Sequence, residues 1–297
     1  MEDVTSNKIQ KLVESKNMVI FTCTFYKNLS DLRLQQCLKT IEHPAHGATA
    51  LPIVIVDGSP DEIHEYIKSR VGSIAIVRKE EGSFGKGKGG ALREAAYVAS
   101  NLPGVTDSTW LCWQEAEKSD MMRCWHTEIY PCLQLKNQAS SPNNPSNSMI
   151  VKNDDVVICP TREDNSFQKT YPIEQYHSET FGNYYLNCVM KEAYKKEEYQ
   201  SVYNDIDWHF GPFAFRRKVL HLWMKYKGNS YDAQMVPIVI AIRKGYHIRS
   251  DIEVSFCLDE NMKQQEEENL NFIEKRLYQL NDFDPKVKQS WNDPIND

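Results

Sequence analysis

Apolar, strand-like runs alternate with helix-like segments through the first part of the chain, and this order constrains the fold more than any other feature. The runs are residues 18–25, 51–56, 73–77 and 109–113. Residues 51–56, LPIVIV, are apolar without a break, which is typical of a parallel strand buried on both faces of its sheet. Strands that alternate with helices are typical of a parallel sheet with crossover helices. The sequence therefore predicts an α/β fold, with a mostly parallel, Rossmann-like sheet flanked by helices.

The second half of the chain contains a low-complexity segment and ends in a helical one. Residues 137–148, NQASSPNNPSNS, have the composition of a mobile surface loop. Residues 260–280 are predicted to form an amphipathic helix. Its apolar face carries Leu270, Ile273, Leu277 and Leu280. We expect one domain over residues 1–260, with residues 261–297 packed on it as a helix and tail; the alternative place for that helix is an interface in a homo-oligomer.

Charge and cysteine usage exclude several classes of protein. The chain has 35 basic and 41 acidic side chains and a net charge of −6, whereas a nucleic-acid-binding surface usually needs a basic surplus. The polar N-terminal segment lacks the apolar core of a signal peptide, and no apolar run approaches transmembrane length. The eight cysteines lack CxxC spacing, and several lie in apolar runs. They are typical of reduced, buried thiols, so we expect a cytoplasmic protein without nucleic-acid partner or transmembrane segment.

A glycine-rich loop that leads into a helix is the strongest binding motif. Residues 84–101, FGKGKGGALREAAYVASN, interleave four glycines with Lys86 and Lys88 and then take on helical periodicity. Such a loop lets backbone N–H groups approach an anion, and the helix dipole and lysines add positive potential. The sequence predicts a phosphate or diphosphate site here; the alternative is a flexible turn before a helix.

Other polar residues follow strands that end at the same edge of the predicted sheet. Asp57 comes directly after residues 51–56, and Ser59 with Glu62 and Pro60 predicts a capping box for the next helix. Glu115 and Glu117 come directly after residues 109–113. Ligands of open α/β sheets bind beyond the carboxyl ends of the strands. We therefore expect Asp57, the glycine-rich loop and the two glutamates to converge on one site.

The order of these motifs resembles that of GT-A glycosyltransferases. The series comprises VDGSPDE after a strand, GKGKGGALREA, an acid-x-acid pair after a strand, GPFAFRRKVL and YDAQMVPIVIAIRKGYHI. Inverting family-2 enzymes have such a series, and the retaining mannosylglycerate synthases and glucosyl-3-phosphoglycerate synthases have a similar KGxGxALR segment. The resemblance covers residues 18–256. It implies a nucleotide-diphosphate-sugar donor, a UDP- or GDP-sugar, and a Mn²⁺ or Mg²⁺ cofactor.

The resemblance also implies residues that bind the donor. Asp57 would accept hydrogen bonds from the base or ribose, and its alternative role is that of a turn residue. The lysines would approach the diphosphate, with a solvated loop as the alternative, and Arg93 in the first turn of the helix lies close enough to join them. The expected donor-binding residues are Asp57, Lys86, Lys88, Gly89, Arg93, Glu115 and Arg162.

The metal motif departs from the usual Asp-x-Asp of the family, because this chain has Glu115 and Glu117. Residues two apart in an extended segment point the same way, so both carboxylates can reach one divalent cation, which would neutralise the departing diphosphate. Glu117 is the expected direct ligand, and the alternative is a pair of exposed acids. The retaining relatives complete the site with a late histidine, which this chain lacks near residues 254–259. Asp259 is the expected substitute and Asp251 is a second candidate; the alternative is that metal binding is weaker or absent.

Acceptor and catalytic residues are expected in the last two motifs. Asp232 falls where inverting relatives have their base, and a helix N-cap is its alternative role. Trp208, His209 and Phe210 are expected to form an acceptor platform, with core packing as the alternative. The sequence thus predicts a glycosyltransferase, with inversion slightly favoured over retention. The rival functions are an inactive nucleotide- or sugar-binding protein of the same fold and a sugar-phosphate nucleotidyltransferase. Sugar-phosphate nucleotidyltransferases have a glycine-rich loop directly after the first strand. This chain has TFYKNLSD at that position, which argues against a nucleotidyltransferase.

Overall fold

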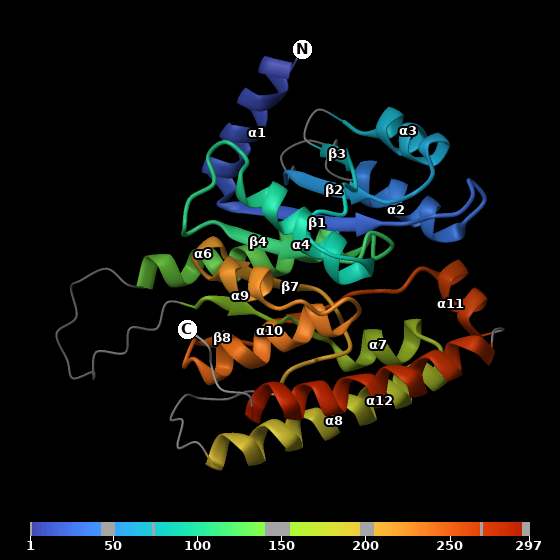
Figure 1. Ribbon diagram of the computed structural model, residues 1–297, viewed down its shortest axis with the longest axis vertical. Helices are drawn as coiled ribbons and strands as arrows, with labels where there is room; N and C mark the ends of the chain where they lie inside the picture. Colours follow the sequence, from blue (N-terminus) through green and yellow to red (C-terminus); the bar gives the residue numbers. More distant parts are fainter. Residues whose placement is uncertain are drawn as a thin grey trace.

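A seven-stranded sheet forms the centre of the computed structural model, which describes residues 2–42, 51–72, 75–139, 155–196, 205–267 and 270–292. Figure 1 shows this sheet with helices on both of its faces. The strand order is β3-β2-β1-β4-β7-β5-β8, and β6 pairs with β9 in a separate small sheet. The strands are β1 (Met18–Thr24), β2 (Ile53–Asp57), β3 (Ala75–Lys79), β4 (Trp110–Trp113), β5 (Val157–Ile158), β6 (Thr161–Arg162), β7 (Phe213–Arg216), β8 (Ile248–Arg249) and β9 (Glu253–Val254).

The sheet is mostly parallel, as the sequence predicts. Strand β1 pairs in parallel with β2 and β4, and β2 pairs in parallel with β3. Strand β7 is the exception among the described strands, because it runs antiparallel to both β4 and β5. The α/β prediction is confirmed, but β7 is not predicted by the sequence analysis, which takes its residues as the approach to a helix.

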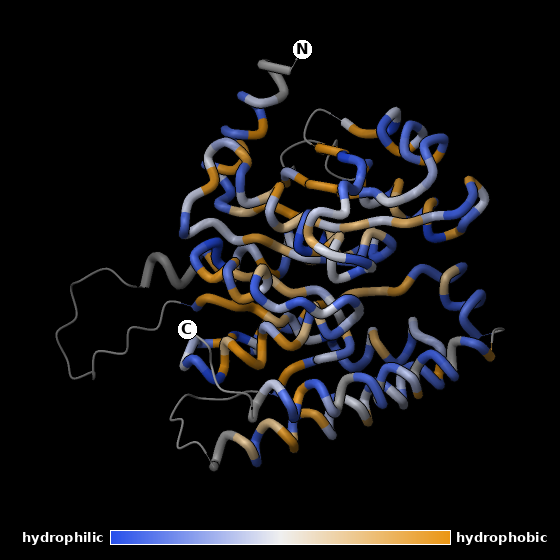
Figure 2. Tube along the Cα trace, in the orientation of Figure 1, coloured by the Kyte–Doolittle hydropathy of each residue, from blue (hydrophilic) through white to orange (hydrophobic). Residues whose placement is uncertain are grey.

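The alternation of side chains along β1 and β2 explains why both strands are apolar throughout. Val19 and Phe21 pack in one buried cluster with helices α1 (Glu2–Lys16), α4 (Gly87–Ser100), α9 (Leu220–Lys225) and α10 (Asp232–Arg243). Met18 and Ile20 pack in a second cluster with α2 (Leu32–Glu42), α3 (Asp61–Arg70) and the π-helical segment η3 (Trp125–Ile129). Because successive strand residues point to opposite faces, each face needs its own apolar set. Figure 2 shows the resulting hydrophobic strands at the centre.

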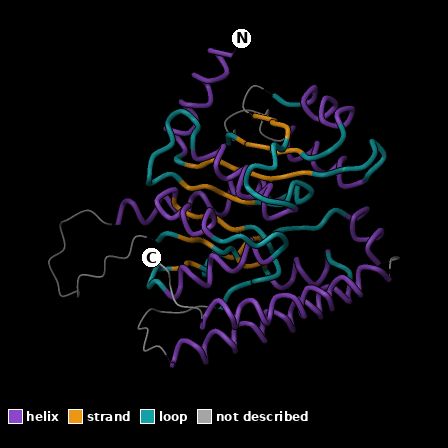
Figure 3. The backbone as a smooth tube through the Cα atoms, viewed as in Figure 1, coloured by secondary structure: helices purple, strands orange, loops and turns teal. Residues whose placement is uncertain are grey.

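The C-terminal chain forms two helices where the sequence predicts one. These are α11 (Glu260–Glu267) and α12 (Leu270–Asn292), and α12 packs along α8 (Ile173–Lys196) and α10. Figure 3 shows these long helices together below the sheet. Leu270 and Leu277 are 77% and 60% exposed, so these two residues of the predicted apolar face do not pack against the chain. The homo-oligomer and the domain boundary at residue 260 stay predictions.

The remaining described helices are short or end at undescribed residues. They are α5 (Met121–Cys124), α6 (Tyr130–Ala139), α7 (Asp164–Thr170) and the 3₁₀ turn η4 (Arg217–Val219). The predicted surface loop at 137–148 begins inside α6, and its residues 140–148 lie outside the described residues. No helix in the described ranges is both long enough and apolar enough to span a membrane.

Two local expectations are wrong. Ser59 does not cap α3: the N-cap position is Pro60, without a side-chain hydrogen bond, and the Ser59 hydroxyl donates instead to Asp57 Oδ1 at 2.6 Å. The cysteines are free thiols as expected, but they are not all buried, because Cys188 and Cys257 are exposed.

The glycines at the start of α4 allow another part of the chain to approach closely. A Cβ atom on Gly89 would lie 2.1 Å from the carbonyl oxygen of Gly228, and one on Gly87 would lie 2.7 Å from that of Asn229. The Gly89 N–H group also donates to the Asn229 carbonyl at 3.2 Å. Helix α4 therefore begins against the segment that joins α9 to α10, and the absence of side chains is what permits this contact.

We expect Gly89→Ala to destabilise the fold. The added methyl group collides with backbone rather than with a flexible side chain, so the free energy of unfolding should fall by about 1–3 kcal/mol. Urea unfolding of the variant and the wild type measures this change. Ser83→Ala, in the exposed loop before α4, is the control and should stay within about 0.5 kcal/mol of wild type. Equal stability of the two variants would contradict the close-contact role of Gly89.

Candidate functional site

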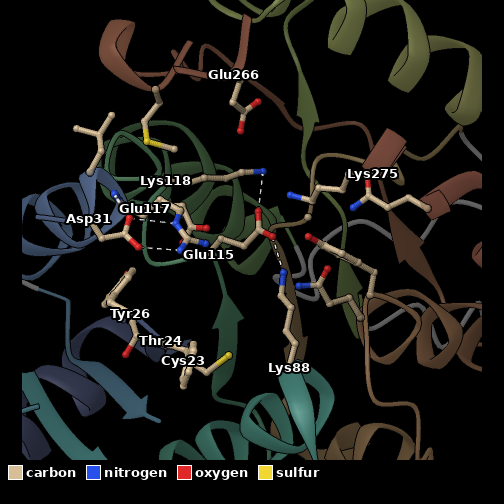
Figure 4. A pocket seen from close by; sticks show the side chains of 18 of the residues that line it. Cys23, Thr24, Tyr26, Asp31, Lys88, Glu115, Glu117, Lys118, Glu266 and Lys275 are labelled. Atoms are coloured by element: carbon tan, nitrogen blue, oxygen red, sulfur yellow. Dashed lines mark hydrogen bonds and ion pairs between the residues drawn. The ribbon is translucent and has the colours of Figure 1, made fainter. Parts of the chain in front are cut away.

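A cavity of about 1110 Å³ lies at the carboxyl ends of β1 and β4. The loop after β1, the first turn of α4 and the segment after β4 line one side, and residues of α8, α11 and α12 line the other. Figure 4 shows Lys88, Glu115, Glu117 and Lys118 inside it, with Glu266 and Lys275 on the far side. The sequence analysis predicts a site at this edge of the sheet, where the cavity lies.

Glu115 lies between two lysines at the centre of this cavity. Lys88 Nζ is 2.5 Å from Glu115 Oε1, and Lys118 Nζ is 3.0 Å from Glu115 Oε2. Burial opposes ionisation of Glu115, but the two ammonium groups outweigh it and hold the pKa of this carboxyl well below its usual range. The same carboxylate raises the pKa of Lys88 against the effect of burial. All three groups are therefore charged at neutral pH.

Aromatic and amide groups fix the position of the two lysines. Lys88 Nζ lies 4.3 Å from the ring centroid of Tyr231 and 5.9 Å from that of Trp113. Lys118 donates to the carbonyl of Phe210 and lies 5.0 Å from its ring centroid. Ammonium groups over aromatic faces gain a favourable electrostatic contact. Both lysines are thus held in place without a ligand.

Gln234 joins the same cluster from α10. With its amide oxygen turned toward the cavity, it accepts a hydrogen bond from Trp113 Nε1 at 2.8 Å and from Lys88 Nζ at 3.3 Å. Gln234 lines the cavity, whereas Asp232 on the same helix does not. A polar residue of α10 therefore reaches the site, two positions beyond the one that the sequence analysis selects.

Glu117 also lines the cavity, and it has no hydrogen bond or ion pair within the described part of the chain. The lining contains six acidic and four basic side chains in all. No group of three or more His, Cys, Asp and Glu side chains suited to a metal occurs among the described residues. A divalent cation that keeps several waters needs only one or two protein carboxylates when substrate phosphates supply the rest. Glu117 fits that kind of site.

Asp57, a predicted donor-binding residue, is instead hydrogen bonded to neighbouring protein groups. Its carboxylate is fully buried and accepts hydrogen bonds from Thr24 Oγ1 at 2.8 Å and from the Ser59 hydroxyl. His64 Nδ1 lies 3.0 Å from its other oxygen. Asp57 does not line the cavity. In this conformation it organises the turn after β2, which is the alternative role considered above.

Three further predicted donor-binding residues of the α4 segment lie outside the cavity. Lys86 is exposed at the N-cap of α4, and Gly89 is buried against residues 228–229. Arg93 is 1% exposed and donates to the carbonyls of Phe84, Tyr226 and Gly228 at 2.8–2.9 Å. Arg93 therefore binds the glycine-rich loop and the α9–α10 connection to α4, so its described contacts are structural.

Arg162 is also enclosed by protein. Its guanidinium is fully buried, 2.7 Å from Glu179 Oε2 and 2.7 Å from Asp207 Oδ1, and it stacks 3.6 Å from the ring centroid of Phe167. The Arg162 side chain is not part of the cavity lining, although Glu179 is. The expected contact between Arg162 and donor is thus replaced by a buried ion-pair network behind the cavity.

The predicted acceptor platform divides between core and cavity. Trp208 is 3% exposed and donates through Nε1 to Asn187 Oδ1 at 3.0 Å, and Phe210 is fully buried against Phe256. Core packing, the alternative role, describes both of these residues. His209 lines the cavity, and its backbone N–H group donates to Asn183 Oδ1 at 3.0 Å.

Asp232 and Asp259 bind other protein groups and do not line the cavity. Asp232 accepts hydrogen bonds from the Tyr226 hydroxyl at 2.8 Å and the Ser230 N–H group at 2.9 Å, and Lys286 Nζ lies 3.4 Å away. Asp259 accepts from Lys39 Nζ at 2.9 Å near the start of α11. Neither carboxylate lines the cavity, so the structure brings together Lys88, Glu115, Glu117 and His209 from the predicted set.

The sequence analysis misses several residues of the cavity. Lys118 directly follows the acid-x-acid pair, and this adjacent position is the sequence feature that could have identified it as a site residue. Asp31 and Arg33, in the loop after β1, line the cavity and form an ion pair at 2.8 Å. Residues of α11 and α12 line it from far along the chain, which no local pattern indicates.

Comparisons with known proteins identify the fold. No protein-family model and no curated protein sequence matches the chain. Glucosyl-3-phosphoglycerate synthase from M. tuberculosis matches with a TM-score of 0.51 and 10% identity, over 98% of this chain and 86% of that one. The same enzyme in complex with Mn²⁺, UDP-glucose and phosphoglyceric acid matches with a TM-score of 0.53 and 10% identity, over 98% and 85% of the two chains. The complex with UDP matches with a TM-score of 0.52, the same identity and the same two coverages.

These likenesses confirm the predicted fold class. The chain has the α/β fold of GT-A glycosyltransferases, with a mostly parallel sheet flanked by helices. Its similarity to glucosyl-3-phosphoglycerate synthase extends over nearly all of the chain. At 10% identity the likeness establishes the fold and leaves the chemistry to be argued from the residues of this chain.

The network around Arg162 gives a prediction about stability and pH. Burial opposes ionisation of Asp207, but Arg162 outweighs it and lowers the pKa of the Asp207 carboxyl. Its contribution is therefore present above the ordinary aspartate pKa of about 3.9 and is lost as pH falls through the lower pKa of the folded state. Asp207→Asn should reduce the free energy of unfolding by about 3–5 kcal/mol at neutral pH.

Urea unfolding at neutral pH and at about pH 3, below the ordinary aspartate pKa, measures this effect. The difference between Asp207→Asn and wild type should shrink at the lower pH. Asp205→Asn is the control, because the Asp205 side chain is 62% exposed; its effect should stay within about 0.5 kcal/mol. A pH-independent difference for Asp207→Asn would contradict an ionised Asp207 as the source of the stability.

Proposed function

We propose that this chain is a glycosyltransferase that moves a sugar from a nucleotide-diphosphate sugar to an acceptor hydroxyl. The observation that carries this proposal is a large cavity at the ligand-binding edge of a GT-A fold. It is lined by Glu117, which has no ion pair among the described residues, and by two lysines that Glu115 holds in place. Solved structures of that fold bind UDP-glucose, so a UDP-sugar is the preferred donor and a GDP-sugar the alternative.

Mn²⁺ or Mg²⁺ is part of this proposal. Solved structures of the fold contain Mn²⁺ together with UDP-glucose. The cavity lining has more carboxylates than basic groups, so a bound diphosphate needs an added cation to balance its charge. Glu117 is the residue that would hold the cation jointly with the diphosphate. The bound cation would supply Lewis-acid stabilisation of the charge on the departing diphosphate.

The acceptor would enter from the side of the cavity that α11 and α12 line. Gln265 and Glu266 of α11 and Asn271 and Lys275 of α12 line that side. Amide and charged side chains of this kind bind hydroxyl groups by hydrogen bonds. Lys275 Nζ lies 5.9 Å from the ring centroid of Tyr231, the ring that Lys88 also contacts, so an acceptor placed here would lie next to the donor.

The contacts of Asp232 do not support a role as the base of an inverting reaction. Its carboxylate is 3% exposed and is hydrogen bonded to Tyr226 and Ser230. A base must reach the acceptor proton directly or through one water. The proposed transfer therefore assigns Asp232 no catalytic step. An inactive nucleotide-binding protein would share the donor site and differ by the lack of turnover.

A thermal-shift experiment with UDP and Mn²⁺ tests the donor site. Ligand at about a hundred times its dissociation constant stabilises the folded state by about 2.7 kcal/mol, which raises the melting temperature of a chain of this size by about 5 °C. Wild type should show this rise with UDP and Mn²⁺ together. Glu117→Gln should show a much smaller effect of Mn²⁺. The control is Glu65→Gln on α3, where the Glu65 side chain is 67% exposed.

Release of UDP from UDP-glucose, with added sugars or polyols as acceptors, tests the reaction. Turnover by wild type that Glu117→Gln reduces at least tenfold would support the transferase. UDP binding without turnover of any nucleotide sugar would identify an inactive binding protein. Failure of UDP, GDP and other nucleoside diphosphates to shift the melting temperature would overturn the proposed donor site.

A further inference from the structure

Lys118 is the least expected feature of the cavity. It follows the acid-x-acid pair directly, and its side chain turns back so that Nζ reaches Glu115 Oε2 at 3.0 Å. Lys88 reaches the other oxygen of the same carboxylate from α4. Figure 4 shows the two ammonium groups approaching Glu115 from opposite sides. The Lys118 and Lys88 side chains are 13% and 26% exposed, and both line the cavity.

This arrangement changes what Glu115 can do. A carboxylate with an ammonium group on each oxygen already has strong charged partners, and a metal cation bound to it would lie close to two positive charges, which disfavours ligation. The three groups together carry one net positive charge. Glu117, by contrast, has no ion pair within the described ranges. The two acids of the motif therefore differ in chemistry although they stand two residues apart.

We propose that Lys118 and Lys88 bind the diphosphate of the nucleotide donor, and that Glu115 is the counter-ion that positions them and not a metal ligand. This inference rests on the proposed function and adds a residue, Lys118, that the resemblance to known glycosyltransferases does not supply. Glu117 remains the carboxylate that faces the divalent cation.

The surroundings of the lysines suit this role. Each ammonium group has three N–H donors. Lys118 uses one for Glu115 and one for the Phe210 carbonyl. Lys88 uses one for Glu115 and one for the Gln234 amide oxygen, so one donor of each lysine remains for a phosphate oxygen. Phe210 lies beside Lys118, and Tyr231 and Trp113 lie beside Lys88, so both charges are fixed before the ligand arrives. Groups that are already ordered lose less conformational freedom on binding. The first turn of α4 also lines the cavity, and the dipole of this helix favours an anion there.

Calorimetric titration of UDP, with Mn²⁺ and with a chelator in its place, separates the lysines from the metal. Lys118→Gln should weaken UDP binding about tenfold or more in both conditions, because the lost ammonium group acts without the metal. Glu117→Gln should weaken binding only when Mn²⁺ is present. For Glu115→Gln, the ratio of the UDP dissociation constant with chelator to that with Mn²⁺ should equal the wild-type ratio.

Two controls separate this role from loss of folding or of general charge. Lys118→Arg keeps the positive charge and should recover most of the affinity that Lys118→Gln loses. Lys225→Gln removes an exposed lysine of α9 that does not line the cavity, and its UDP affinity should equal that of wild type. Unchanged far-ultraviolet circular dichroism of each variant shows that the fold is retained.

The outcomes distinguish this inference from the proposed function. Wild-type affinity in Lys118→Gln, or loss of the Mn²⁺ effect in Glu115→Gln, would overturn the inference and leave a metal-dependent transferase in place. Lack of UDP binding by wild type in both conditions would overturn the proposed function and the inference together. The inference is supported if Lys118→Gln binds UDP more weakly both with and without Mn²⁺, and if Mn²⁺ still strengthens UDP binding by Glu115→Gln.

Discussion

The site depends on a backbone contact that only glycine permits. Helix α4 begins against the carbonyls of Gly228 and Asn229, where a Cβ on Gly89 would lie 2.1 Å from an oxygen atom. Arg93 stabilises the same contact, because its guanidinium donates to carbonyls on both sides of it. Helices α4 and α10 thereby meet at the edge of the sheet. Lys88 from the first and Gln234 from the second reach the cavity as a result.

A second consequence of this contact is electrostatic. The glycine-rich segment resembles a phosphate-binding loop, yet the Gly89 N–H group already donates to the Asn229 carbonyl. In the proposed donor site, this segment would contribute the ammonium group of Lys88, which lies over Tyr231 and is paired with Glu115. The positive charge of the site is therefore carried by side chains that the backbone orients.

The fold can be predicted from the sequence more completely than the contacts of individual side chains can. Apolar periodicity locates β1 to β4 and their flanking helices, since burial on both faces leaves a strong local signal. The antiparallel β7 escapes detection, because it depends on pairing with β4 and β5, which are distant in sequence. The same limit applies at the site. Motif order selects Glu115 and Glu117 correctly as cavity residues, but it cannot show that two lysines bind only the first of them.

Asp232 illustrates how a residue can influence a site without facing it. Its carboxylate lies 3.4 Å from Lys286 of α12, and it also accepts a hydrogen bond from Tyr226. This ion pair joins α10 to α12, and α12 lines the side of the cavity that an acceptor would enter. A single acidic residue at the start of α10 thus links the helix that carries Gln234 with the helix that carries Lys275. The described contacts of the position that resembles a catalytic base are therefore structural ones, with Tyr226, Ser230 and Lys286.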